Sequence, residues 1–299
     1  MFEKLSAALA RDRIARKLAE GQILMDHGHL KEALSLYTNL VAYAKRTLGQ
    51  LDPTTADCIN RVALCQQARG DSQRAINLHR ESLAILEESL GAQDARTLEA
   101  RRNLGALMCT VGIPDEAIPV LERTIVDASR ALPHAHPFRL RSQSSLGQAY
   151  VLYGASAKAI EILEPTLRDC ERLLSQQHGL TLVTRSRLGS AYRVHGDSER
   201  AVSTLTQALD ELAELLGQDN PDVLGCRLNL AMAHAQAGDP DAAEMVARAR
   251  AQYERVLGPN DARTLNAAIS LAEAYQLAGD PERALPIFEK ALVDCERWA

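Results

Sequence analysis

A glycine recurs at a nearly constant interval along the whole chain. Steps of 42 residues from Gly112 reach another glycine in both directions, and one last step of 41 residues reaches the seventh. These seven pivot glycines are Gly28, Gly70, Gly112, Gly154, Gly196, Gly238 and Gly279. So regular a spacing over 299 residues predicts a stack of similar structural units, each packed mainly against its neighbours.

Small residues occupy two further positions in every repeat. Alanine is the fifth residue after each pivot glycine, and glycine or alanine is the seventh residue before it. The residue preceding that small one is a branched apolar residue in six repeats, and Glu20 is the departure. Small side chains let two helix backbones approach closely, while apolar neighbours fill the seam. Each repeat is therefore predicted to be a helical hairpin, with helix A before the pivot glycine and helix B after it.

This hairpin pattern resembles the tetratricopeptide repeat. The usual repeat has about 34 residues, so a 42-residue unit leaves about one extra turn for each helix. The longer unit is similar to the kinesin light chain type, which is also common in bacterial signalling proteins. The linkers support this resemblance, because the family joins Leu-Gly through a short spacer to His-Pro at the next helix. Here the linkers read LGQLDP, LGAQDA, LPHAHP, LSQQHG, LGQDNP and LGPNDA.

The resemblance implies an all-α fold, a right-handed superhelical α-solenoid of seven hairpins. We expect residues 1–299 to form a single array. Its repeats are expected at approximately 1–49, 50–91, 92–133, 134–175, 176–217, 218–258 and 259–299.

The residue that opens each helix A after the first is predicted to cap that helix. Asp and Asn side chains accept hydrogen bonds from free backbone N–H groups at a helix start, and proline is tolerated directly after them. The expected caps are Asp52, Asp94, His136, His178, Asn220 and Asp261. His134 and His136 also form an HxH pair that could bind a metal, but His136 coincides with the family's His-Pro cap.

Composition and motifs argue against an enzyme. The chain contains no phosphate-binding loop, no HExxH, no GxSxG and no Cys-His pair at a defined spacing, so we expect no catalytic residue, metal or cofactor. The six cysteines form no CxxC pair. No apolar run approaches about 18 residues, which argues against a membrane span, and charges interrupt the apolar runs of the N-terminal segment, which argues against a secretory signal. We expect a cytoplasmic protein.

Charge separates between the two kinds of helix. The seven A helices sum to +9 and the seven B helices to −10, although the whole chain carries −5. The resemblance implies that A helices line a concave groove and B helices the outer face. We therefore expect a basic groove on an acidic protein.

The candidate binding residues lie on the A helices. The ninth residue before the pivot faces the groove in the family, where asparagine commonly bonds a peptide backbone, and Asn103 and Asn229 match that role. Arg61 and Arg187 replace the amide by a cation at the same position. Arginine suits carboxylates because its planar fork bonds both oxygens. Further candidates for this surface are Arg102, Arg141 and Arg193.

These features favour a scaffold that binds an extended or helical, acidic peptide segment of a partner protein. Nucleic-acid binding along the same groove is an alternative, but single-strand binders add stacking aromatics that these positions lack. A sensor region of a larger signalling ATPase is a further alternative. The last helix B carries an apolar stripe, a candidate surface for self-association or for a continuation of the chain. The stripe consists of Leu285, Phe288, Leu292 and Trp298.

Overall fold

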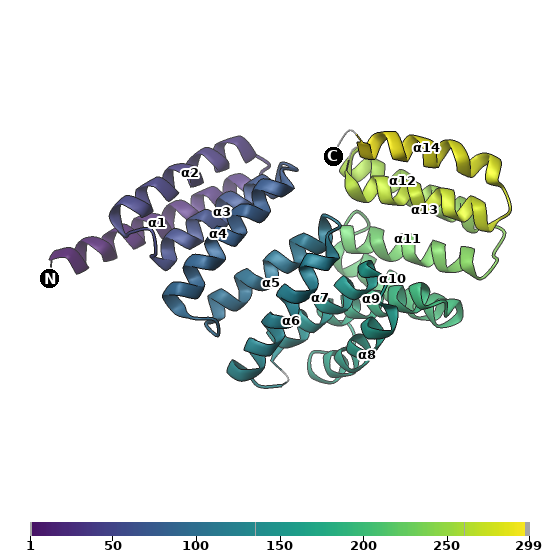
Figure 1. The fold of residues 1–299 in the computed structure, drawn as a ribbon, viewed down its shortest axis with the longest axis horizontal. Coiled ribbons are helices and arrows are strands. Elements are labelled where there is room, and N and C mark those ends of the chain that lie inside the picture. The colour runs from purple at the N-terminus through teal and green to yellow at the C-terminus, as the bar shows by residue number, and fades with distance from the viewer. Residues whose placement is uncertain (1, 135, 260, 297–299) are drawn as a thin grey trace. The chain divides into compact units, whose positions relative to one another are not determined.

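The computed structural model of this chain describes residues 2–134, 136–259 and 261–296. The predicted all-α class is confirmed, since these residues form fourteen α-helices and no strand (Figure 1). The helices are α1 (Phe2–Asp26), α2 (Leu30–Thr47), α3 (Pro53–Ala68), α4 (Ser72–Leu90), α5 (Ala95–Thr110), α6 (Pro114–Ala131), α7 (Pro137–Tyr153), α8 (Ser156–Leu173), α9 (Gly179–His195), α10 (Ser198–Leu216), α11 (Pro221–Gln236), α12 (Ala242–Leu257), α13 (Ala262–Leu277) and α14 (Pro281–Glu296).

Consecutive helices pair into hairpins, with the odd-numbered helices as helix A and the even-numbered ones as helix B. A pivot glycine lies in each turn, and all seven have φ between 77 and 92°. This left-handed conformation is open to glycine because it has no Cβ to meet the following carbonyl oxygen. Gly154, for example, is the left-handed C-cap of α7. The recurring glycine therefore marks the place where each helix A must end.

The predicted caps of the A helices are confirmed. Each of the six side chains accepts a hydrogen bond from the backbone N–H two residues further on, at 2.8 to 3.2 Å. His136 and His178 accept through Nδ1, from Phe138 and Leu180. His136 is thus a helix cap, and the described residues contain no group of three His, Cys, Asp or Glu side chains that could hold a metal ion.

The small position seven residues before the pivot glycine sets how closely the two helices of a hairpin approach. A Cβ added to Gly147 on α7 would lie 2.4 Å from Cγ of Leu163 on α8, which is closer than real atoms come. Gly21, Gly105 and Gly189 face Tyr37, Leu121 and Leu205 in the same way. Where the sequence has alanine instead, the residue sixteen positions later is His79, Ala247 or Phe288 rather than leucine or tyrosine. Glycine is therefore present where the facing side chain fills its space.

Replacing Gly147 with Ala should destabilise the protein, although alanine is the better helix former. Overpacking a tight core site costs about 1 to 3 kcal/mol, and the helical gain from alanine offsets at most about 1 kcal/mol. In the Leu163→Ala background the same change should become neutral or stabilising, because its obstacle is gone. Urea unfolding of the four proteins of this cycle measures the coupling.

Gly225 provides the matched control. It also lies inside a helix, α11, but a Cβ there would meet only the hydroxyl of Tyr253, at an ordinary 3.5 Å. Gly225→Ala should therefore be neutral or stabilising. Equal losses at Gly147 and Gly225 would show that the helix contact is not what requires glycine.

The chain divides into two compact units, Met1–His134 with α1 to α6 (unit 1) and Ala135–Ala299 with α7 to α14 (unit 2). The boundary falls in the linker between the third and fourth predicted repeats. In the other five linkers the corresponding residue has φ between 85 and 120°. Here it is Pro133, which cannot take a positive φ, and Leu132 before it is extended (φ −128°, ψ 147°). The residues in the other linkers are Gly49, Gly91, Ser175, Gly217 and Gly258.

This linker therefore follows a backbone path that the others do not. That residues 1–299 act as a single array stays a prediction.

Candidate functional site

The A helices of unit 2 contact one another in series, α7 with α9, α9 with α11, and α11 with α13. Side chains on the same face of these helices can therefore form one continuous surface. Four of the predicted binding residues belong to this series. They are Arg141 on α7, Arg187 and Arg193 on α9, and Asn229 on α11.

Arg193 and Asn229 are brought into direct contact. Nε of Arg193 donates a hydrogen bond to Oδ1 of Asn229 over 3.1 Å. Burial lowers the pKa of Arg193, and the negative charge of Glu273 on α13 opposes part of that change. Among the described residues, no carboxylate oxygen lies within 4.0 Å of the Arg193 guanidinium. Arg193 is thus a half-buried cation held by a neutral amide.

Arg187 is anchored in a similar way. Its Nη1 donates to the hydroxyl oxygen of Ser144 on α7 over 2.9 Å, and the Thr184 hydroxyl donates to the same oxygen over 3.0 Å. Ser144 and Thr184 are fully buried, so this contact ties α9 to α7. Arg141 is exposed on α7, three residues before Ser144. The cations of unit 2 therefore lie on neighbouring, connected helices.

The predicted residues of unit 1 are arranged differently. Arg61 on α3 donates through Nη1 to Oε1 of Gln22 on α1, over 2.7 Å. Arg102 on α5 pairs with Glu99 at 2.7 Å and also donates to Oδ1 of Asn103 at 2.6 Å. The charge of Arg102 is therefore matched within its own helix, and its hydrogen bond occupies the amide oxygen of Asn103.

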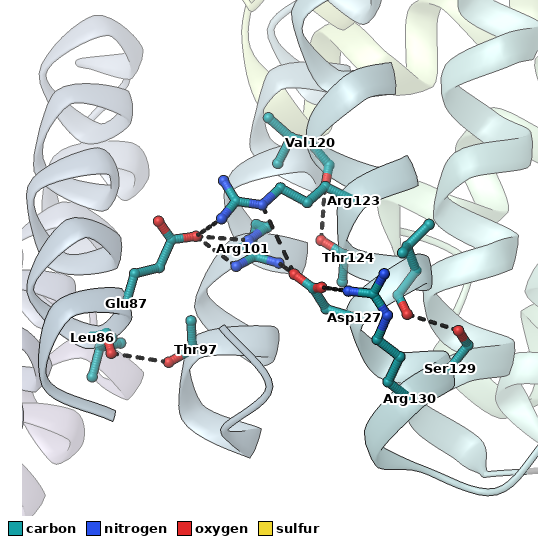
Figure 2. A network of polar contacts seen from close by, with 11 residues as sticks. Leu86, Glu87, Thr97, Arg101, Val120, Arg123, Thr124, Asp127, Ser129 and Arg130 are labelled. Carbon is teal, nitrogen blue, oxygen red and sulfur yellow. Dashed lines mark hydrogen bonds and ion pairs between the residues drawn. The ribbon is translucent and has the colours of Figure 1, made fainter. Parts of the chain in front are cut away.

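A buried arginine of unit 1 was not predicted from the sequence. Arg101 on α5 is only 2% exposed and lies between two carboxylates of flanking B helices (Figure 2). It pairs with Glu87 of α4 at 2.5 Å and with Asp127 of α6 at 2.7 Å. Arg123 and Arg130 of α6 complete the network around these carboxylates, at 3.4 to 3.8 Å (Figure 2). Arg101 thus joins the second repeat to the third.

Unit 2 has the same arrangement two repeats further along the chain. Arg185 on α9 occupies the same position before its pivot as Arg101, is 8% exposed, and pairs with Glu171 of α8 at 3.0 Å and Glu211 of α10 at 3.8 Å. Both arginines point to the B helices. The +9 total of the A helices therefore overstates the charge that they can offer to a ligand.

The sequence did contain a signal for these pairs. Arginine stands eleven residues before the pivot in three repeats, and both buried arginines have acidic residues fourteen positions earlier and 26 positions later. Charge counts alone cannot find such pairs, because they do not distinguish the two faces of a helix.

Three of the described cysteines are buried, unreactive thiols. Burial raises the pKa of Cys58 to about 12 and the pKa values of Cys170 and Cys226 to about 11. These thiols stay protonated near neutral pH and therefore pack as small apolar groups. None of the described helices has the length and apolar character needed to cross a membrane.

The predicted apolar stripe of the last repeat is partly exposed. Leu285 and Leu292 on α14 are 59% and 63% exposed, and Phe288 is half-buried. Trp298 lies outside the described residues. In the first repeat, Leu34 and Val41 hold the positions of the two leucines and are half-buried against a cluster that includes residues of α3. These two positions are thus partly covered in the first repeat and exposed to solvent in the last.

Two family models match the sequence, and both are described as tetratricopeptide repeat. One matches residues 13–88, 62–128 and 227–292, and the other matches residues 186–248. Together they span more than half of the chain. The comparison with curated protein sequences gave no match.

Comparison with solved structures also finds helical repeat proteins. The chain is similar to nearly identical TPR-like repeats of the kinesin light chain kind from Podosopora anserina, with 25% identity and a TM-score of 0.61, over 69% of this chain and 97% of that one. It is also similar to the apo form of RapI, with 11% identity and a TM-score of 0.75, over 95% and 99% of the two chains. The Rap conjugation gene regulator of plasmid pLS20, solved with the Phr* peptide, has 14% identity and a TM-score of 0.68, over 95% and 74%. The two Rap likenesses show the fold alone.

Proposed function

Because this chain belongs to the tetratricopeptide repeat family, whose arrays serve as protein-interaction scaffolds, we propose that the A-helix surface of unit 2 binds an acidic segment of a partner protein. The segment lies across α7, α9 and α11, where Arg141, Arg187 and Arg193 meet its carboxylates. Asn229 holds Arg193 in place and presents its amide to the ligand backbone. We call this set of four residues the polar stripe.

The main support for the proposal is that Arg193 is half-buried without an ion pair. A guanidinium withdrawn from water is costly unless an anion compensates it. Arg101 and Arg185 form ion pairs with carboxylates of the protein, whereas Arg193 bonds an amide and has only the more distant charge of Glu273. A ligand carboxylate beside Arg193 would supply a directly paired negative charge through two parallel hydrogen bonds. A Rap regulator with this fold was solved with the Phr* peptide, which supports a ligand of peptide size.

Unit 1 contributes less in this proposal. Arg61, Arg102 and Asn103 stay candidate ligand contacts, but the charge of Arg102 is already matched by Glu99, and Arg102 occupies the amide oxygen of Asn103. A ligand must displace those bonds, so we expect substitutions there to weaken binding less than substitutions in the polar stripe.

Reversing Arg141, Arg187 and Arg193 to Glu should weaken an acidic ligand by roughly tenfold or more, since solvated pairs contribute about 0.2 to 1 kcal/mol each and tenfold corresponds to about 1.4 kcal/mol. The ligand is found by selecting a random phage-displayed peptide library on the wild-type chain. Fluorescence anisotropy of the selected peptides then measures affinity. Wild-type affinity should fall as salt rises, because salt screens such pairs.

Two variants serve as controls. Arg248→Glu makes the same charge change on the exposed face of α12, where Arg248 pairs with Glu244, and should leave affinity unchanged. Asn229→Ala should weaken binding with little change in its salt dependence, because the amide carries no charge. If the triple variant selects and binds the same peptides as wild type, the polar stripe is not the binding site.

We also propose that the exposed leucines of α14 support self-association, because Leu285 and Leu292 place adjacent apolar surface in solvent. Leu285→Glu with Leu292→Glu should lower the weight-average mass at high concentration without loss of helicity. Light scattering and circular dichroism check this, with the exposed Leu277→Glu as the matched control. A wild-type chain that stays monomeric at the highest concentration removes this proposal.

A cytoplasmic location is part of the proposal as well. Five described cysteines are free thiols, which suits a reducing compartment. Cell fractionation that finds the chain with an exported fraction would contradict it.

A further inference from the structure

Glu273 extends the polar stripe onto α13, where the sequence had suggested no binding residue. It lies six residues before its pivot glycine, and Ser270 lies nine before, at the position that Arg187 and Asn229 hold in their own repeats. Residues three apart share one face of a helix, so Glu273 belongs to the same surface. It is exposed, and among the described residues its carboxylate lies within 4.0 Å of no cation.

The charge on this surface therefore changes from positive to negative across three successive A helices. α9 presents the cations Arg187 and Arg193, α11 presents the neutral Asn229, and α13 presents the anion Glu273. The negative charge of Glu273 opposes the lowering of the Arg193 pKa by burial, which is consistent with both side chains facing the same surface. A uniformly acidic ligand would be attracted by the cations of α9 and repelled by Glu273 of α13.

We propose that the bound segment carries an acidic side chain for Arg193 and a basic side chain for Glu273, an inference that rests on the proposed binding function of the polar stripe. The ligand is then a bipolar peptide segment rather than an acidic one. Because the two charges stand at different ends of the surface, they also fix the direction in which the segment lies.

The geometry sets the spacing of the two ligand charges. Packed helices lie about 8 to 10 Å apart, so α9 and α13 are separated by about 16 to 20 Å. An extended peptide rises about 3.3 Å per residue, and the Arg193 side chain reaches toward α11 and shortens the span. The acidic and basic residues of the ligand should therefore be about four positions apart, a spacing at which both side chains of an extended peptide point to the same face.

The test uses four versions of one peptide selected from the library, changed only at two positions about four residues apart, so that both side chains of the extended peptide face the surface. The pairs at these positions are Glu/Lys, Lys/Glu, Glu/Glu and Lys/Lys. Wild type should bind one of the two mixed peptides about two- to fivefold more tightly than Glu/Glu, as expected for solvated ion pairs. Glu273→Lys should make Glu/Glu the best ligand, and Arg193→Glu should make Lys/Lys the best.

The charge-swapped variant gives the sharpest result. Arg193→Glu with Glu273→Arg should prefer the mixed peptide of opposite order to the one preferred by wild type. Glu289→Lys makes the same charge change on the exposed part of α14 and should leave the ranking as in wild type.

The outcomes separate this inference from the proposed function. If wild type binds Glu/Glu as well as either mixed peptide, and Glu273→Lys changes no ranking, the bipolar ligand is wrong while acidic-peptide binding stands. If Arg193→Glu leaves all four affinities unchanged, the polar stripe is not the binding site and both proposals fail.

Discussion

Replacing Arg101 with Met should lower the stability of unit 1 by about 3 to 5 kcal/mol, the usual cost of removing one partner from a buried ion pair. The change leaves Asp127, which is 10% exposed, and Glu87 without their central cation. Arg123 and Arg130 still lie near these carboxylates, so the loss should fall toward the lower end of this range. Hydrogen exchange followed by mass spectrometry should show the loss of protection in α4, α5 and α6.

A triple variant tests the cause of that loss. Adding Glu87→Gln and Asp127→Asn to Arg101→Met removes the stranded charges, and stability should recover in part because uncharged groups are easier to bury. Arg185→Met is the matched change in unit 2 and should reduce protection in α8 to α10 instead. If the triple variant is less stable than Arg101→Met alone, the unpaired carboxylates are not the cause of the lost stability.

Acid should destabilise the second repeat through His79. This side chain is 2% exposed on α4, and burial lowers its pKa to about 4 from an ordinary 6.5. The folded state thus favours the neutral imidazole, while the unfolded chain takes up a proton as the pH falls below 6.5. Stability is complete above the unfolded pKa and decreases as the pH falls toward the folded pKa. The loss attributable to His79 should be about 2 kcal/mol between pH 7 and pH 5 and about 3 kcal/mol in full.

His79→Phe separates this loss from the titration of the other groups. His79 stands sixteen residues after Ala63, and the seventh repeat has phenylalanine sixteen residues after alanine, in Phe288 and Ala272. The variant should lose about 2 kcal/mol less stability than wild type between pH 7 and pH 5 in urea unfolding. An NMR titration that finds the pKa of His79 near 6.5 in the folded protein would contradict the argument.

Local chemistry made much of the fold predictable from the sequence. Gly154 ends α7 because a positive φ there favours glycine, and Asp52 begins α3 because its carboxylate satisfies a free N–H group. Such roles depend on neighbours a few residues away. The same reasoning identified His136 as a cap rather than a metal ligand.

Long-range packing made the site harder to predict. Arg101 and Arg102 are adjacent in sequence, yet Arg101 is buried among B-helix carboxylates and Arg102 pairs within its own helix. Only the placement of α4 and α6 decides between these environments. Arg193 was proposed for its charge, but its burial and its bond to Asn229 depend on α11. Pro133 was visible in its linker, although the division of the chain there was not inferred from it.

The facing pairs of small and large residues have a consequence for how such a chain can grow by duplication. Gly147 and Leu163 belong to one hairpin, so a duplicated hairpin contains both residues of the contact between its two helices. The pairs of Arg101 and Arg185 instead reach back into the preceding hairpin, to Glu87 and Glu171. A hairpin moved to a new place therefore keeps its internal fit but needs a compatible predecessor. The exchangeable module in this protein is a whole hairpin, and its position in the order is restricted by charge.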